Sequence, residues 1–588
     1  MCAENKESTE KRPRKKAGVL KKKQVVVFGI GAFIAIAGIV GGITLLTSFP
    51  EKKILYISYT DLAVGIDPLE TWVPDDYEII NQVAEGLFAH DLANHQSQII
   101  HNLAVNHSKN ENATEYIFEL RQNVQFHDGT LFNAAAVQWN IERLCTLIEN
   151  GKMHYTSTQF WLFSDGTWII NRTEIINNYI IKFILNKPYI PLTALLASTN
   201  SFMVSPTSTP KDDFINGHTG DLIGTGPFLY EVWNVNSSLI LSANPNYWGG
   251  KPKIDKLIFK YYATAEDKFE AMLSGELSIL SGYNEIFAHA TFLDSLGIYD
   301  NDILNTFKNH PDIIVEEGPP SATFFDYLVM NNELINVTMR KAISYACNYS
   351  GYIDKWLGGH GVRLKSPIPE GILYSNATGI EVPYYNISIA RQTLKDVNWN
   401  GLAGALTADD NISAGNQWEK LVDDGTPLAT YNFSYLSGML NGIVFLNIVS
   451  KDLKQIGVKV EAVELTLGEY YEISHFHLNM IELSHMGYII RFNDPSSIIN
   501  ILCSNKALDL NYCQVNDTLA QQWMEEALSE TNEVAREQYY YQIQKHLIEE
   551  VFPMCYLIVK NCFRIYQSNL KGFEINHFNP VYKDLYFI

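Results

Sequence analysis

The chain has 588 residues, of which 46% are hydrophobic and 19% charged. This length exceeds one ordinary hydrophobic core, so the composition predicts a globular protein of two or more lobes. Nine of its 44 basic residues lie within residues 1–23, which leaves 35 basic against 62 acidic residues in the remainder. The acidic character of the chain after residue 23 argues against nucleic acid as a partner, because the phosphates would be repelled.

Residues 25–49 are predicted to form a transmembrane anchor behind a basic cytoplasmic tail at residues 1–24. The 23 residues 25–47 carry no charge and would span about 34 Å as a helix, enough for a bilayer core. A cleaved signal peptide is the alternative, although the stretch exceeds a typical signal core. The basic flank would keep the N-terminus in the cytoplasm, giving a single-pass protein of the cell membrane with an extracellular body.

Two other features agree with an extracellular body. Asn-x-Ser/Thr sequons are about twice as frequent as the roughly five expected by chance, which favours a glycoprotein, with an Asn-rich composition as the alternative. The eleven sequons begin at Asn106, Asn112, Asn171, Asn236, Asn336, Asn348, Asn376, Asn386, Asn411, Asn432 and Asn516. Cys503 and Cys513 could close a small disulfide loop outside the cell, whereas the alternative is two free buried thiols.

Strand and helix patterns alternate after the anchor. Residues 54–59 alternate as a strand and residues 77–88 have the periodicity of a helix. Residues 115–120 again alternate, Asp128-Gly129 predicts a turn, and Asn133 is a good N-cap for an amphipathic helix. This strand, turn and helix could belong to many folds on physical grounds alone.

The amino-acid sequence of this segment is more specific than its secondary-structure pattern. Residues 118–137 read F-x-L-R-x-x-V-x-F-H-D-G-x-x-F-x-A-x-x-V, which resembles the signature of extracytoplasmic solute-binding proteins of the peptide/nickel ABC-transporter family (family 5). The phrases E-G-L-F at residues 85–88, G-T-G-P-F at 224–228 and N-P-x-Y-W-G-G-x-P-x-I-D at 244–255 match the same family in order. No Lys-Ser/Thr follows the glycine-rich loop, so we expect tight turns there and no phosphate cradle.

The second half continues the resemblance. The sequence predicts strands on both sides of Gly318-Pro319-Pro320, where the chain would cross between lobes. Further predicted elements are a helix over residues 337–357, a helix and strand over 440–463, a helical region over 519–550, and strands over 554–566. The resemblance implies an α/β, two-lobed fold of the periplasmic-binding-protein type II class with hinge strands. Its discontinuous first lobe would comprise residues 50–318 and 552–588, and its second lobe residues 319–551.

The resemblance also implies that solute is enclosed between the lobes. Peptide binders of the family hold the peptide amine with an Asp four residues before a proline, and here Arg491 stands four before Pro495. A second cation about 4 Å away would be repelled by on the order of 4 kcal/mol, so Arg491 suits a carboxylate, a phosphate or sugar hydroxyls. The alternatives are that Arg491 pairs with Asp494, or that Asp494 itself binds the amine.

Other candidate ligand-binding residues are aromatic side chains and one histidine near expected cleft segments, and for each aromatic residue core packing is the alternative. They are Trp72, Trp161, Tyr283, Tyr435, His485 and Tyr488. The H-F-H phrase at residues 475–477 lacks acidic or Cys partners at set spacing, so we predict no metal site and no cofactor.

No catalytic phrase such as H-E-x-x-H or G-x-S-x-G occurs, so we expect no enzyme. The predicted function is that of a membrane-anchored receptor that captures a peptide, oligosaccharide or similar small solute by lobe closure and delivers it to ABC-transporter permease subunits. The alternatives are a surface hydrolase acting on glycans or peptides, and an interaction protein that kept the fold but lost transport. The His127-Asp128 pair is expected to fix its turn and not to contact solute.

Overall fold

The computed structural model describes most of the chain after residue 51. The described ranges are 52–59, 65–71, 74–91, 98–152, 158–215, 220–280, 302–409, 411–438, 440–502, 511–573 and 581–588. The predicted tail and anchor, residues 1–24 and 25–49, lie outside them. Among the described residues, no helix has the length and apolar character needed to cross a membrane. Residues 52–588 pack as one compact unit.

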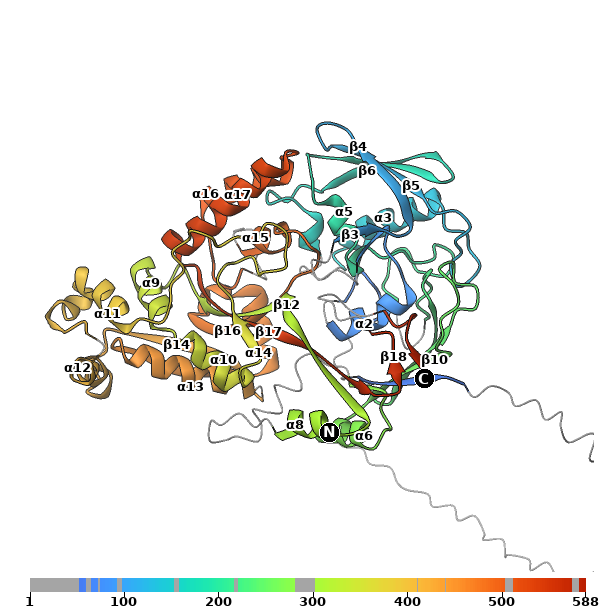
Figure 1. The fold of residues 1–588 in the computed structure, drawn as a ribbon. Helices are drawn as coiled ribbons and strands as arrows, with labels where there is room; N and C mark the ends of the chain where they lie inside the picture. The colour runs from blue at the N-terminus through green and yellow to red at the C-terminus, as the bar shows by residue number, and fades with distance from the viewer. Residues whose placement is uncertain are drawn as a thin grey trace, which may run out of the picture. The chain divides into compact units, whose positions relative to one another are not determined.

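A large mixed sheet dominates this unit (Figure 1). Its strand order is β15-β14-β16-β12-β17-β11-β1-β10-β9-β8, and β13 pairs with β17 off this path. The strands are β1 (Ile54–Tyr59), β8 (Phe228–Asn234), β9 (Ser238–Ala243), β10 (Lys256–Tyr261), β11 (Ile279–Leu280), β12 (Ile313–Met330), β13 (Gly361–Arg363), β14 (Ala429–Leu436), β15 (Val458–Leu465), β16 (Leu483–Ile489) and β17 (Met554–Gln567).

Two long antiparallel strands, β12 and β17, occupy the middle of this sheet and run side by side (Figure 1). The sequence predicts two strands separated by Gly318-Pro319-Pro320, whereas the structure continues β12 through these residues. Register shifts on either side of Pro320 absorb the proline, because a residue without an N–H group fits a strand where the ladder is irregular.

Smaller sheets complete the strand inventory. A four-stranded antiparallel sheet has the order β4-β5-β7-β6, and two hairpin-like pairs join β2 to β3 and β18 to β19. These strands are β2 (Phe88–His90), β3 (Ile99–His101), β4 (Ala104–Lys109), β5 (Glu115–Leu120), β6 (Ile170–Asn177), β7 (Ile180–Leu185), β18 (Leu570–Lys571) and β19 (Tyr586–Phe587).

The helices surround these sheets, and α3 contacts β6 and β7 of the four-stranded sheet. The α-helices are α2 (Pro74–Val83), α3 (Ala134–Glu149), α5 (Leu192–Leu195), α6 (Ala265–Leu273), α8 (Asp302–Asn309), α9 (Val337–Ala346), α10 (Tyr349–Leu357), α11 (Ile387–Asp396), α12 (Ile412–Asp423), α13 (Leu440–Lys454), α14 (Leu467–Phe476), α15 (Ser496–Leu502), α16 (Thr518–Ser529) and α17 (Glu533–His546). Short 3-10 or π turns are η2 (Gln159–Trp161), η3 (Thr199–Ser201), η4 (Trp399–Gly401), η5 (Ala403–Ala405), η6 (Leu478–Met480) and η7 (Leu547–Val551).

Three predicted helices end or break earlier than expected. The helix predicted over residues 77–88 stops at Val83, because the Val83 carbonyl accepts the Gly226 N–H at 2.9 Å and Glu85 forms an antiparallel bridge with Met203. The helix predicted over 337–357 breaks between α9 and α10, where Asn348 caps the new helix with its side chain. The region predicted over 519–550 breaks between α16 and α17, where Asn532 is the cap.

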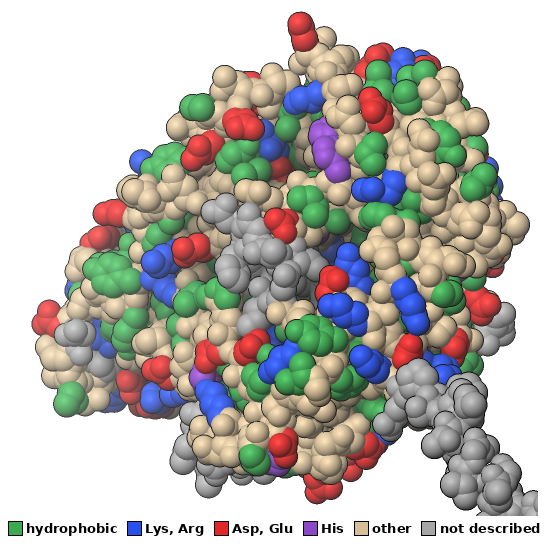
Figure 2. All heavy atoms as spheres, turned by 45° about the vertical axis from the view of Figure 1, so that its right-hand side comes forward, with side chains coloured by type: hydrophobic (Ala, Val, Ile, Leu, Met, Phe, Trp, Pro, Cys, Tyr) green, Lys and Arg blue, Asp and Glu red, His purple; other side chains and the backbone are tan. Residues whose placement is uncertain are grey.

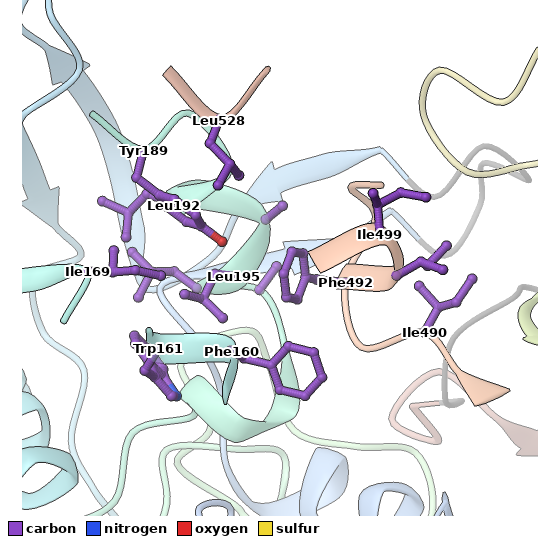
Figure 3. Close-up of a cluster of buried hydrophobic side chains, with 14 of the residues drawn as sticks. Phe160, Trp161, Ile169, Tyr189, Leu192, Leu195, Ile490, Phe492, Ile499 and Leu528 are labelled. Carbon is purple, nitrogen blue, oxygen red and sulfur yellow. The ribbon is translucent and has the colours of Figure 1, made fainter. Parts of the chain in front are cut away.

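Four clusters of buried hydrophobic residues form the core, and β12 and β17 contribute side chains to all four. The largest cluster joins Phe160 and Leu195 to Phe492, whose ring centroid lies 6.0 Å from that of Phe160 (Figure 3). Phe160 belongs to the predicted first lobe and Phe492 to the predicted second. Segments more than 300 residues apart in the chain therefore share one core, while the predicted lobe boundaries themselves remain a prediction.

Candidate ligand-binding site

A cavity of about 330 Å³ opens beside the C-terminal end of α2. It is lined by Asn81, Ala84, Glu85, Ala89, His90, Asp91, Ile100, Asn102, Ala197, Ser198, Thr199, Phe202, Pro227, Tyr247, Trp248, Arg491, Val581, Lys583 and Asp584. The lining therefore combines polar side chains of both charge signs with aromatic and aliphatic surface, which is typical of sites for small polar solutes.

Glu85 forms the most elaborate part of the wall. Its buried carboxylate accepts hydrogen bonds of 2.8 Å each from the Thr225 hydroxyl, the Tyr247 hydroxyl and the Trp248 indole N–H. Burial raises the pKa of Glu85, and the hydrogen bonds from Trp248, Thr225 and Tyr247 oppose this rise. Glu85 thereby orients the Tyr247 and Trp248 rings, both of which line the cavity.

The glycine-rich loop supports this wall by close backbone approach. A Cβ on Gly224 would lie 2.1 Å from the Val83 carbonyl oxygen, and one on Gly226 would lie 2.7 Å from it. The Gly226 N–H donates to the same carbonyl at 2.9 Å. The loop thus packs directly on the end of α2, so its glycines serve close contact instead of the tight turns that the sequence suggested.

The signature segment, residues 118–137, contacts the cavity wall from behind through Arg121. The Arg121 guanidinium lies 4.2 Å from the Trp248 ring centroid, a cation–π distance, and its Nε donates to the Asn102 carbonyl at 3.0 Å. The E-G-L-F, signature and Y-W-G-G phrases therefore meet beside one wall of the cavity, although 29 residues separate the first from the second and 109 the second from the third.

The His127-Asp128 turn is structural, as the sequence predicts. His127 Nε2 lies 3.0 Å from the Gly226 carbonyl oxygen, and the Asp128 carboxylate accepts hydrogen bonds of 2.5 and 2.6 Å from the Ser205 and Ser208 hydroxyls. Burial lowers the pKa of His127 to about 4. The turn holds the glycine-rich loop in place and lies outside the cavity lining.

Arg491 reaches the cavity from the segment that follows β16. Its neighbours Ile490 and Phe492 are 2% and 1% exposed and are held in the largest hydrophobic cluster, near Phe160 and Leu195 (Figure 3). The Arg491 guanidinium donates to the Tyr77 hydroxyl of α2 and lies 5.0 Å from the centroid of the Tyr77 ring. Two buried neighbours therefore fix the backbone that presents this cation.

The charges around the cavity are mixed. Arg491 and Lys583 supply cations, and Asp91 and Asp584 supply carboxylates. Burial lowers the pKa of His90 to about 3, so this histidine is neutral at physiological pH. Lys, Arg, Asp and Glu side chains are likewise interspersed with hydrophobic ones on the face shown in Figure 2.

Three of the predicted ligand-binding residues lie elsewhere in the core. Trp161, in η2, is 2% exposed and belongs to the largest hydrophobic cluster (Figure 3). Tyr488 is also buried and its hydroxyl donates to the Ser497 carbonyl at 2.5 Å. His485 stacks on Phe445 with ring centroids 3.6 Å apart, and its Nε2 lies 2.9 Å from Asp326. The structure brings none of the three to the cavity, because each is used in packing.

Asp494 is likewise absent from the cavity lining. Its carboxylate pairs with Arg536 at 2.8 Å, with both side chains under 5% exposed. It also accepts the backbone N–H of Ser496 at 3.0 Å, at the start of α15. Asp494 therefore neither pairs with Arg491 as suggested nor reaches a solute in this cavity.

The remaining predicted residues give no site. Tyr435 lies on β14, half-buried and away from the cavity. Trp72, Tyr283 and Cys503 lie outside the described residues. Cys513 is buried, and because Cys503 is not described, the Cys503–Cys513 disulfide stays a prediction.

Sequence reasoning found Arg491 but missed Glu85, Tyr247, Trp248 and Lys583. The first three stand inside the phrases that carry the family resemblance, which indicates the family but not a role for these side chains. No group of three or more His, Cys, Asp or Glu side chains that could hold a metal occurs in the described ranges.

Comparison with known proteins defines the family. The model of bacterial extracellular solute-binding proteins, family 5 Middle, matches residues 98–508. The chain belongs to this family. It is therefore a solute-binding protein and not an enzyme, which removes the hydrolase alternative.

Relatives and solved structures agree with the family 5 assignment. The chain is 23% identical over 560 residues to the probable D,D-dipeptide-binding periplasmic protein DdpA of Escherichia coli K12, covering 92% of this chain and 96% of that protein. It is 24% identical over 548 residues to the glutathione-binding protein GsiB of Shigella dysenteriae, covering 92% and 95%.

Two solved structures show the same fold. The periplasmic binding protein DppA of Helicobacter pylori in complex with peptide STSA has a TM-score of 0.71 at 19% identity, covering 91% of this chain and 98% of that one. NikA of Brucella suis in complex with Fe(III)-EDTA has a TM-score of 0.73 at 18% identity, covering 91% and 100%. The predicted α/β, two-lobed periplasmic-binding-protein fold is confirmed.

Proposed function

We propose that this chain is the membrane-anchored, extracellular receptor of an ABC importer and that it binds a short peptide, or a similar small solute with a carboxylate, in the cavity lined by Arg491. The observation that carries this proposal is the contact of Arg491 with Tyr77 of α2, 414 residues away in the chain, at the cavity. A guanidinium presents forked donors that match a carboxylate.

Cavity size and charge favour a short zwitterionic solute. A volume of about 330 Å³ lies near the lower end of the roughly 300–1,000 Å³ usual for small-molecule sites. Asp91 and Asp584 line the same cavity and can attract an ammonium group. The names of the relatives, which mention a D,D-dipeptide and glutathione, support the same class of solute.

The proposed mechanism is closure of two lobes around solute, with no bond made or broken. β12 and β17 contribute to every hydrophobic cluster and are the connections about which such a hinge would work. Opening would admit the solute, and closure would exclude water around it. The loaded receptor would then deliver the solute to the permease subunits.

The proposed location rests on the N-terminal sequence. The uncharged residues 25–47 behind nine basic residues support a retained anchor with a cytoplasmic N-terminus and an extracellular body. Protease added to intact cells should remove the body and leave a membrane-bound fragment of about 5 kDa. A body that stays intact under such treatment, while an added surface control is digested, would contradict this location.

The binding proposal is tested with matched peptides. Di- to pentapeptides with a free C-terminal carboxylate should raise the melting temperature of the full-length protein, by the equivalent of about 2.7 kcal/mol at a hundredfold excess over Kd. C-terminal amidation should weaken binding to the natural protein by about tenfold or more, because a charge-assisted hydrogen bond contributes about 1.5–3 kcal/mol. Calorimetric titration measures both values.

Arg491→Gln should bind the free acid as weakly as the amide, whereas the exposed control Arg172→Gln should behave as the natural protein. An equal effect of amidation on the Arg491→Gln variant and the natural protein would remove Arg491 from the site. The bound peptide should be recovered unchanged after incubation.

A further inference from the structure

Two buried cysteines meet where α9 packs on β17. Cys347 follows the last residue of α9, Cys555 lies near the start of β17, and their sulfur atoms are 3.6 Å apart. Their side chains are 0% and 1% exposed. The two residues are 208 positions apart in the chain, so no spacing in the sequence indicates that they are neighbours.

Both sulfur atoms are enclosed by buried side chains. The Cys555 sulfur also lies 3.7 Å from the Ser344 hydroxyl and 4.0 Å from the Met330 sulfur. Both cysteines belong to the second hydrophobic cluster. A bond of about 2.05 Å between the sulfurs requires them to approach by about 1.5 Å.

Buried hydrogen bonds already fix the backbone on both sides of the pair. Arg340 of α9 donates from Nε to the Phe552 carbonyl at 3.0 Å and from Nη2 to the Val551 carbonyl at 2.8 Å. Its side chain is largely buried. Helix α9 is therefore held in register with the residues that lead into β17, so the thiols stay adjacent in the folded chain.

We infer that Cys347 and Cys555 form a disulfide in the exported protein, tying α9 to β17. Proteins of this family are extracellular, and disulfides persist in oxidising compartments. The inference rests on that location and not on the identity of the solute.

The oxidant is the disulfide of a thiol–disulfide exchange protein. The thiolate of one cysteine attacks that disulfide and forms a mixed disulfide with the exchange protein. The thiolate of the other cysteine then attacks the sulfur of the first cysteine, which forms the Cys347–Cys555 bond and releases the exchange protein. The two cysteines lose two protons and two electrons, and the exchange protein leaves as its dithiol. The neighbouring Cys555 thiol and burial both raise the pKa of Cys347 in the folded state, so the exchange takes place before the second cluster closes.

Thiol mapping tests this inference directly. Cells exporting the full-length protein are quenched with acid and the unfolded chain is alkylated without reduction. Mass spectrometry of the digest should show the Cys347 and Cys555 peptides joined, two hydrogens lighter than their sum, and separated by reduction. Cys145, which is partly exposed on α3, should be alkylated and serves as the internal control.

A thermal measurement gives a second readout. In a Cys513→Ala background, reduction should lower the melting temperature by on the order of 2–5 °C. The same reduction should leave the melting temperature of the Cys347→Ala/Cys555→Ala variant unchanged, and Cys145→Ala should respond as the background does. Full alkylation of Cys347 and Cys555 without reduction, or an equal thermal response in the double variant, would overturn the inference.

Discussion

Arg491 and Arg536 lie close to the same short segment, and the structure uses them in opposite ways. Arg536 is 3% exposed, pairs with Asp494 at 2.8 Å and donates to the Ala527 carbonyl at 2.8 Å. Arg491 is half-buried, donates to the neutral hydroxyl of Tyr77 and lines the cavity.

The different surroundings of the two arginines indicate which one stabilises the fold and which one can contact a solute. The charge of Arg536 is matched inside the core by Asp494, so its contribution is to hold α17 against the segment before α15. Arg491 presents its guanidinium at a cavity large enough for a small solute. We therefore expect substitution to affect mainly stability at one arginine and mainly binding at the other.

The largest predicted effect is on stability, at Asp494. Asp494→Ala leaves the buried charge of Arg536 without its carboxylate, which should lower the free energy of unfolding by about 3–5 kcal/mol. Urea denaturation of the full-length protein measures this loss. The double variant Asp494→Ala/Arg536→Met should recover a substantial part of it, because the uncompensated charge is removed as well. Equal losses in the single and double variants would show that the pair is not coupled.

A smaller predicted effect is the pH dependence contributed by His127. Burial holds the pKa of His127 at about 4, against 6.5 for the exposed side chain, so the unfolded chain binds a proton more readily between these values. Stability should therefore fall as the pH drops from about 6.5 to about 4, by about 1.4 kcal/mol per pH unit from this residue.

His127→Gln keeps a donor for the Gly226 carbonyl and removes the titrating group. Urea midpoints measured between pH 7 and 5 should fall less steeply for this variant than for the natural protein. His90, whose pKa is also lowered by burial, contributes the same slope to both proteins and cancels from the comparison. Parallel slopes would contradict the role assigned to His127.

The smallest predicted stability effect is at Arg491. Arg491→Gln should change the free energy of unfolding by less than about 1 kcal/mol, because the buried Tyr77 hydroxyl keeps the Thr71 carbonyl and Asn200 as partners at 3.1 and 3.2 Å. Urea denaturation beside the exposed control Arg172→Gln measures it. A loss as large as that of Asp494→Ala would make Arg491 a structural cation and break the comparison.

Much of the fold could be predicted from the sequence because its signals are local. The alternation over Glu115–Leu120 and the Asn133 cap, whose side chain accepts the Ala136 N–H at 3.0 Å, are present as expected. The Asp128-Gly129 turn is also present, with Gly129 at φ +86°. Such features depend on neighbours within a few residues, so a single sequence reveals them.

The site could be predicted only in part because its contacts are distant. Glu85 meets Thr225 and Trp248, which follow 140 and 163 residues later. Asp494 resembles a ligand-binding carboxylate in the sequence, because nothing nearby in the chain shows that it pairs with Arg536, which lies 42 residues further on. Neither pairing has a signature in spacing.

The sequons illustrate how one pattern can serve two purposes. Asn336, Asn348, Asn386 and Asn411 each cap a helix through the side chain. Helix capping favours asparagine at these positions, so part of the sequon excess has a structural origin. Glycosylation remains a prediction that a mass shift after glycosidase treatment would test.

The position of β17 near the end of the chain has a consequence for biogenesis. Its side chains complete all four hydrophobic clusters, yet it is not synthesised until residue 554. A nascent chain that lacks β17 has no finished core and exposes the long edge of β12. The protein therefore remains incompletely folded until β17 has been synthesised, and the pairing of β17 with β12 acts as a late step of assembly.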